Sequence, residues 1–188
     1  MSPALPCALP VACCEGVGVS LRSLLEGLRR DGELKIITRE VNPRLEATAL
    51  MRKYGGRPVL FERVSGAEYR VLAGLAGSRR SLATALGVEE TELVEKLAVA
   101  MKNPATPPLI EHPPCQQVAE PEVDLRKLPI LTQTPEDAGA YITAGILIIR
   151  DPGFGRNAAF HRLLKIGRRE LVARLVEGRG THTAWKTA

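Results

Sequence analysis

The 188-residue sequence predicts a mixed α/β (α+β) fold, in which an N-terminal α/β module precedes an incomplete β-rich module. Three observations lead to this prediction. Helical and strand-like hydrophobic patterns alternate over residues 20–103. Six prolines then fall within residues 104–122, which we interpret as a linker because proline removes backbone donors and disfavours helix. Residues 123–188 carry apolar stretches of strand character separated by turn residues.

Each helix predicted in the α/β module has a recognisable start or stop signal. Ser20 and Ser78 are suitable N-caps, Asn42-Pro43 places proline in a first turn, and Gly87 is a suitable stop. The predicted helices cover residues 21–32, 44–56, 79–87 and 88–103. In the last of these helices an apolar stripe predicts core packing, and its members are Leu93, Leu97, Ala100 and Met101.

The strands of this module are short. Residues 33–41 (ELKIITREV) alternate apolar and polar side chains, as a half-buried strand does. Residues 57–64 (RPVLFERV) form the next predicted strand, and residues 70–77 (RVLAGLAG) a third, whose glycines suit a close approach of backbones. Helices and strands therefore alternate along this part of the chain.

The second module is predicted to begin with an extended stretch at residues 123–131 and a loop at 132–141. Three strands follow, and the clearest turn, DPGFGRN, joins the first two. Three or four strands cannot close a barrel on their own, so this module looks unfinished. The predicted strands cover residues 141–151, 157–167 and 169–176.

The net charge of +5 is concentrated locally. The segment from Arg150 to Arg179 contains eight Arg or Lys residues and three acidic ones. Such a cationic segment is typical of binding to phosphate, carboxylate or nucleic acid. Single-strand binders interleave aromatic residues with such charges, and this strip has only Phe154 and Phe160, so we do not expect nucleic acid as a partner. No apolar run approaches the roughly 18 residues that span a membrane.

The first 19 residues are predicted to be a disordered leader. They hold three prolines and no early basic residue, which makes a poor signal peptide. Three of the four cysteines lie there, none is in a CxxC spacing, and we interpret all four as incidental in a reducing cytoplasm.

A polar cluster, NAAFHR, interrupts the apolar strands at residues 157–162. Strand alternation places Arg162 on a face with Phe160 and Leu164, which predicts partial burial and a partner for the arginine. His161 lies on the other face. A histidine in such a position more often packs against its neighbours or lies at the surface than acts as an acid or base. Asn157 follows a Gly-rich turn, where asparagine is common for conformational reasons alone.

Several longer segments resemble the UbiD family of reversible decarboxylases (the 3-octaprenyl-4-hydroxybenzoate carboxy-lyase type). They are LRSLLEGLRRDGEL, REVNPRLEATALM, LAGLAGSRRSLATALGV, DLRKLPILTQTPEDAGAYITAGILIIRDP and LVEGRGTHTA, in this order. The resemblance runs from about residue 20 to 184 and corresponds to the N-terminal portion of the family pattern.

The resemblance implies a carboxy-lyase that decarboxylates aromatic or α,β-unsaturated acids with prenylated FMN, Mn²⁺ and often K⁺. It also implies that residues 123–188 are the first strands of a split β-barrel that binds the flavin. It further implies a flavin prenyltransferase that supplies the cofactor, a cytoplasmic location, and either a homo-oligomer or a missing C-terminal half as partner.

The resemblance carries roles to individual residues. It identifies Asn157 as the metal ligand and Arg162 as the catalytic arginine near the substrate carboxylate. An asparagine carbonyl suits a divalent cation, and a guanidinium fork suits a carboxylate. The implied cofactor-binding residues are Phe160, His161, Arg162, Arg174, Leu175, Val176, Arg179 and Gly180.

The family's acidic residues, which include the proton donor, match positions beyond residue 188. We therefore expect this chain to be inactive alone and to need a missing C-terminal half. The alternative is a catalytically dead fragment or a structural or oligomerisation subunit.

Overall fold

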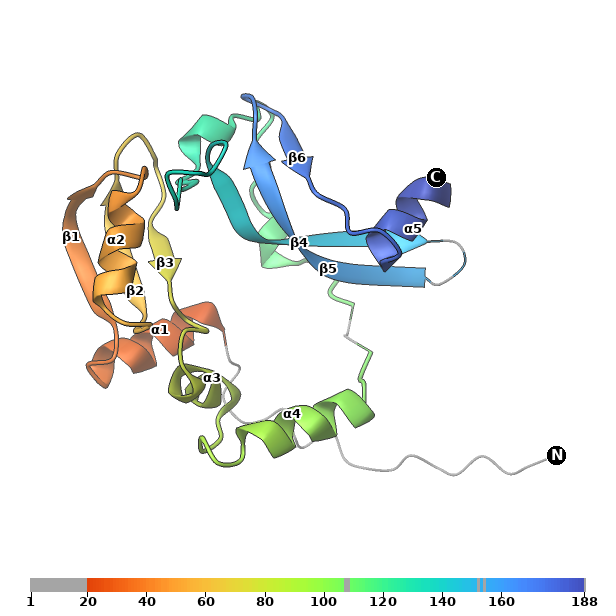
Figure 1. The fold of residues 1–188 in the computed structure, drawn as a ribbon. Coiled ribbons are helices and arrows are strands. Elements are labelled where there is room, and N and C mark those ends of the chain that lie inside the picture. Colours follow the sequence, from red (N-terminus) through yellow and green to blue (C-terminus); the bar gives the residue numbers. More distant parts are fainter. Residues whose placement is uncertain (1–19, 107–108, 152, 154, 188) are drawn as a thin grey trace.

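The computed structural model describes residues 20–106, 109–151, 153 and 155–187, and confirms the mixed α/β class. Two three-stranded sheets lie in separate parts of the chain (Figure 1). The predicted leader, with its three cysteines, lies outside the described residues, as does Phe154. No helix in the described part of the chain is long and apolar enough to cross a membrane.

The first sheet has the strand order β1 (Lys35–Val41), β2 (Val59–Val64) and β3 (Val71–Ala73). Strand β1 is parallel to β2, and β2 is antiparallel to β3. The parallel pair requires a crossover, which helix α2 (Glu46–Lys53) supplies. The remaining helices of this half are α1 (Leu21–Arg30), α3 (Arg79–Leu86) and α4 (Leu93–Lys102).

Local capping explains where α1 and α3 begin and end. Ser20 and Ser23 form a reciprocal capping box at α1, and the Ser78 hydroxyl accepts the Ser81 amide at α3. Gly87 ends α3 in the left-handed conformation, with φ 65°. These three predictions from the sequence are confirmed.

Helix α2 begins later than predicted. The Asn42 side chain accepts the Arg44 amide, and Leu45 has φ 67°, so the residues after Pro43 form a turn. The Leu45 amide donates to the Thr132 carbonyl, which holds this turn against the second half of the chain. The helix therefore starts at Glu46 rather than at the proline, because a long-range contact outcompetes the local start signal.

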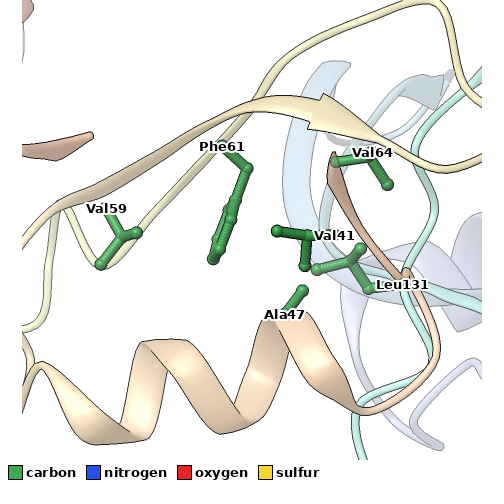
Figure 2. Packing of buried hydrophobic residues seen from close by; sticks show 6 residues of the cluster. All are labelled: Val41, Ala47, Val59, Phe61, Val64 and Leu131. Carbon is green, nitrogen blue, oxygen red and sulfur yellow. The ribbon is translucent and has the colours of Figure 1, made fainter. Parts of the chain in front are cut away.

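The core of the first half lies between the sheet and α2 (Figure 2). Phe61, Val41 and Val59 are fully buried there, with Ala47 from the helix. Leu131 packs into the same cluster from beyond the proline-rich segment. The core therefore joins the start of the second half to the first sheet.

The predicted core stripe of the last helix is wrong. Leu93 is buried, but Leu97 is 45% exposed and Met101 is 84% exposed. The helix also starts at Leu93 rather than at residue 88, because residues 88–92 form a turn. Within the described residues α4 packs mainly through its first turn, next to α3.

The second sheet consists of β4 (Tyr141–Asp151), β5 (Gly155–Lys165) and β6 (Leu171–Ala173), all antiparallel. The described residues form no closed barrel. Short 3-10 helices at Pro114–Gln116 and Leu125–Lys127 precede the sheet, and the second of these replaces part of the predicted extended stretch.

The end of the chain differs from the predicted strand at 169–176. Strand β6 ends at Ala173, and Arg174, Leu175 and Val176 continue without sheet pairing. A turn leads into helix α5 (Gly180–Thr187), which the sequence analysis missed. This helix contacts β4 and β5, so the chain leaves the sheet edge and folds back over the hairpin (Figure 1).

Candidate functional site

The β4–β5 hairpin presents two different faces. Side chains alternate along β5, so Asn157 and His161 share one face, and Phe160 and Arg162 share the other. Helix α5 lies against the hairpin, and its Thr181 meets the face of His161. The site predicted from sequence is thus divided between a covered face and an open face.

Asn157 lies against the first turn of α5. A Cβ atom added at Gly180 would come within 3.2 to 3.3 Å of the Asn157 side chain, so a larger residue at this position would press on the amide. The asparagine is half-buried and pairs with Ile149 across the strands. The structure therefore brings together two of the predicted residues, Asn157 and Gly180, which are far apart along the chain.

His161 is buried, with 9% of its surface exposed, and both ring nitrogens have partners. Nδ1 lies 3.2 Å from the Arg174 carbonyl, and Nε2 lies 3.1 Å from the Thr181 hydroxyl. Because a carbonyl only accepts, we assign the proton of the neutral ring to Nδ1, and Nε2 accepts from Thr181. The histidine thus ties both the segment after β6 and the start of α5 to the hairpin.

Arg162 lies on the open face, and half of its side chain is exposed, a value compatible with the partial burial predicted for it. The predicted partner is present. Arg162 Nη2 lies 2.8 Å from Asp137 Oδ1, and its guanidinium carbon lies 4.2 Å from the centre of the Tyr141 ring. This contact holds the pKa of Asp137 below its ordinary value, since the guanidinium and the Thr134 amide stabilise the carboxylate.

Phe160 is 75% exposed and lies among apolar neighbours on the same open face. Ile146 pairs with it across the strands, and Ile148 is the next outward residue on β4. At the hairpin end Arg150 pairs directly with Arg156. The open face is therefore an apolar surface with cationic side chains at both ends.

The other predicted residues line the path from β6 to α5. Arg174, Val176 and Arg179 are exposed, and Leu175 is half-buried. The Arg179 amide closes the turn by donating to the Val176 carbonyl at 3.2 Å. These residues share one segment with Gly180 and Thr181, but the structure does not bring their side chains onto Arg162.

Sequence reasoning missed Asp137, Tyr141 and Thr181. Asp137 is in a segment predicted only as a loop, and Thr181 is in a helix that was not predicted. One signal could have found Asp137. It is a carboxylate in the loop before β4, and β4 pairs with β5, the strand that carries Arg162. In the described residues no three His, Cys, Asp or Glu side chains gather as a metal cluster.

Two domain families match this chain in succession. Residues 25–101 match the 3-octaprenyl-4-hydroxybenzoate carboxy-lyase N-terminal domain, UbiD_N. Residues 109–188 match the 3-octaprenyl-4-hydroxybenzoate carboxy-lyase Rift-related domain, UbiD.

The chain is also similar to characterised proteins. It is 39% identical over 170 residues to the anhydromevalonate phosphate decarboxylase of Methanosarcina mazei, covering 90% of this chain and 39% of that protein. An evolved dimeric form of the UbiD-class enzyme HmfF from Pelotomaculum thermopropionicum, solved in complex with prFMN, matches with TM-score 0.83 and 39% identity, covering 90% of this chain and 41% of that one.

A more distant enzyme has the same fold. The apo 3,4-dihydroxybenzoic acid decarboxylase AroY of Klebsiella pneumoniae matches with TM-score 0.81 at 28% identity, covering 89% of this chain and 39% of that one. The chain thus spans about two fifths of the length of these relatives. Both domain matches and the structural similarity lead to one conclusion: this chain belongs to the UbiD family of carboxy-lyases.

Proposed function

We propose that this chain forms the N-terminal part of a UbiD-type decarboxylase and provides one side of its prenylated FMN site. The observation that carries the proposal is the contact of Asn157 with Gly180 at the start of α5, on the hairpin that also carries Arg162. The relative from P. thermopropionicum was solved with prFMN, which supports a flavin as the ligand here.

The start of α5 suits the phosphate end of a flavin. The first backbone amides of a helix are free to donate to an anion, and Gly180 allows the helix start to come close to the Asn157 amide. The Asn157 carbonyl is an oxygen ligand of the kind that Mn²⁺ or K⁺ accepts. Since the described residues hold no three-residue metal cluster, the further ligands would be phosphate oxygens or groups outside the described part of the chain.

The open face of the hairpin is suited to contact with the flavin ring system. Phe160 and Ile146 offer apolar contact area there. We propose that the flavin extends from the open face toward the side of α5, where Leu175 and Val176 border it and Arg174 and Arg179 lie near its charged end. His161 contributes by holding α5 and the Arg174 backbone in place. Prenylated FMN, when bound, supplies an electron sink for loss of carbon dioxide.

Arg162 is proposed to bind the substrate carboxylate. A planar guanidinium recognises a carboxylate through two parallel hydrogen bonds, and half of this side chain is open to solvent. The substrate class is an aromatic or α,β-unsaturated carboxylic acid. Arg162→Ala is therefore expected to abolish decarboxylation in the complete enzyme.

The chain alone is proposed to be inactive, because the proton donor would come from a C-terminal half or from another subunit of an oligomer. A flavin prenyltransferase would supply the cofactor, and the site of action would be the cytoplasm. A purely structural subunit is a second candidate, favoured by the exposed apolar face of Phe160, Ile146 and Ile148.

The test is co-expression of the chain with a flavin prenyltransferase, followed by an absorbance spectrum and native mass spectrometry of the purified protein. We expect bound prenylated FMN, lost in Asn157→Ala and retained in the control Asn103→Ala, whose asparagine side chain donates to the Val99 carbonyl at the end of α4. A protein that carries no flavin in the wild type would contradict the proposal and favour the structural subunit.

A further inference from the structure

The loop before β4 fixes one carboxylate firmly. Asp137 Oδ2 accepts the backbone amides of Thr134 at 3.0 Å and Gln133 at 3.2 Å, and the Asp137 amide donates back to the Thr134 carbonyl. Only 8% of the Asp137 side chain is exposed. The loop thus presents the second oxygen, Oδ1, in a fixed position toward β5.

Arg162 meets this carboxylate from the neighbouring strand. Its Nη2 lies 2.8 Å from Oδ1, while its guanidinium lies over the Tyr141 ring. Arginine has many rotamers, and fixing such a side chain in one orientation carries an entropy cost. The ion pair with Asp137 restrains the guanidinium within its plane, and the Tyr141 ring restrains its tilt out of that plane.

The two partners are unequally exposed. Half of the Arg162 side chain is open to solvent, against 8% for Asp137. Among the described residues, Asp137 is the only hydrogen-bond acceptor of the guanidinium. The carboxylate is therefore the anchored member, and the remaining guanidinium nitrogens are available to a ligand.

We propose that Asp137 is a positioning residue, which holds one edge of the Arg162 guanidinium so that the opposite edge faces the substrate carboxylate, with Tyr141 supporting its plane. This inference rests on the proposed function for the identity of the ligand. The positioning contact itself does not depend on a flavin or a substrate, so it is tested separately.

The first test uses the isolated chain without ligand. In an NMR experiment on the Arg162 side chain, restricted rotation gives separate signals for the guanidinium nitrogens. We expect Asp137→Asn to collapse them to the averaged signal of a free arginine. Glu136→Gln removes the adjacent exposed carboxylate and is expected to leave the signals unchanged. Unchanged Arg162 signals in Asp137→Asn would overturn the proposal.

The second test uses the complete, cofactor-loaded enzyme. Misplacing a binding group by about 1 Å can lower rates by about 10²-fold, so we expect Asp137→Asn to lower kcat/KM by roughly 10- to 100-fold. Glu136→Gln is expected to match the wild type. A wild-type kcat/KM in Asp137→Asn, with Arg162→Ala inactive, would overturn the positioning role alone. Full activity in Arg162→Ala would instead overturn the proposed function.

Discussion

The two sheets differ in how far their apolar side chains are buried. The first sheet buries Phe61 completely against α2, whereas the second leaves Phe160 75% exposed on its open face. Val59 and Val41 complete a closed core in the first case, and Ile148 stays 66% exposed in the second. We infer that the first sheet, with Leu131 added to its core, is a structural scaffold. The second sheet is a binding surface whose apolar face is available to a ligand or another polypeptide.

The largest effect is expected from Phe61→Ala. Removing a fully buried aromatic side chain leaves a cavity and costs about 3–5 kcal/mol. Urea unfolding followed by circular dichroism measures the change in the free energy of unfolding. A loss below about 1 kcal/mol, which is typical of an ordinary substitution, would contradict the closed core as the source of stability.

A smaller effect is expected where hydrogen bonds fasten the second sheet to α5. Thr181→Val keeps the side-chain shape but leaves His161 Nε2 buried without its partner, at a cost of about 1–3 kcal/mol. Hydrogen exchange of the α5 amides and urea unfolding measure it. Thr183→Val is the matched control, since Thr183 is exposed on the same helix. If both variants lost the same free energy of unfolding, the contact with His161 would not be what holds α5 to the hairpin.

The acid dependence of stability provides a third test. Arg126, together with Arg168, holds the pKa of Asp124 well below its ordinary value, and Arg168 connects this loop to the turn before β6. A carboxyl with a lowered folded-state pKa stabilises the fold above its unfolded pKa, near 3.9, and this contribution disappears as the pH falls through the folded-state pKa.

Asp124→Asn is therefore expected to be less stable than the wild type at pH 7, with a difference that shrinks as the pH drops below about 4. Urea midpoints measured between pH 7 and pH 2 give the difference directly. A constant difference over this range would show that the loss comes from packing rather than from the charge.

The smallest effect is expected from Phe160→Ala, the counterpart of Phe61→Ala in the open sheet. Because this ring is 75% exposed, we expect the free energy of unfolding of the chain to change by no more than about 0.5 kcal/mol. The same urea experiment measures it. A loss similar to that of Phe61→Ala would contradict the comparison between the two sheets.

The sequence predicted those elements whose signals are local. The caps at Ser20 and Ser78 and the strand at 141–151 depend on neighbouring residues, and the structure has them at these positions. The family resemblance also placed the chain correctly. The start of α2 was missed because the Leu45 amide pairs with Thr132, a contact that no local pattern contains.

The candidate site was only partly predictable for the same reason. Strand alternation gave the two faces of β5 correctly, but which face is covered depends on α5, and the sequence gives this helix no cap signal. The burial of His161 and the exposure of Arg162 are therefore tertiary outcomes. The apolar stripe of α4 has a helical period, and yet period alone does not say whether a partner covers it.

The most direct test that the first sheet is a scaffold and the second a binding surface is a titration of the ¹⁵N-labelled chain with FMN. The backbone amide NMR signals monitor the titration. We expect shifts of the amide signals at Asn157, Gly180 and Thr181 and along residues 160–162, with those of Val41 and Phe61 unchanged. Shifts centred on the first sheet, or none at millimolar FMN, would contradict the assignment of the second sheet as the flavin-binding surface.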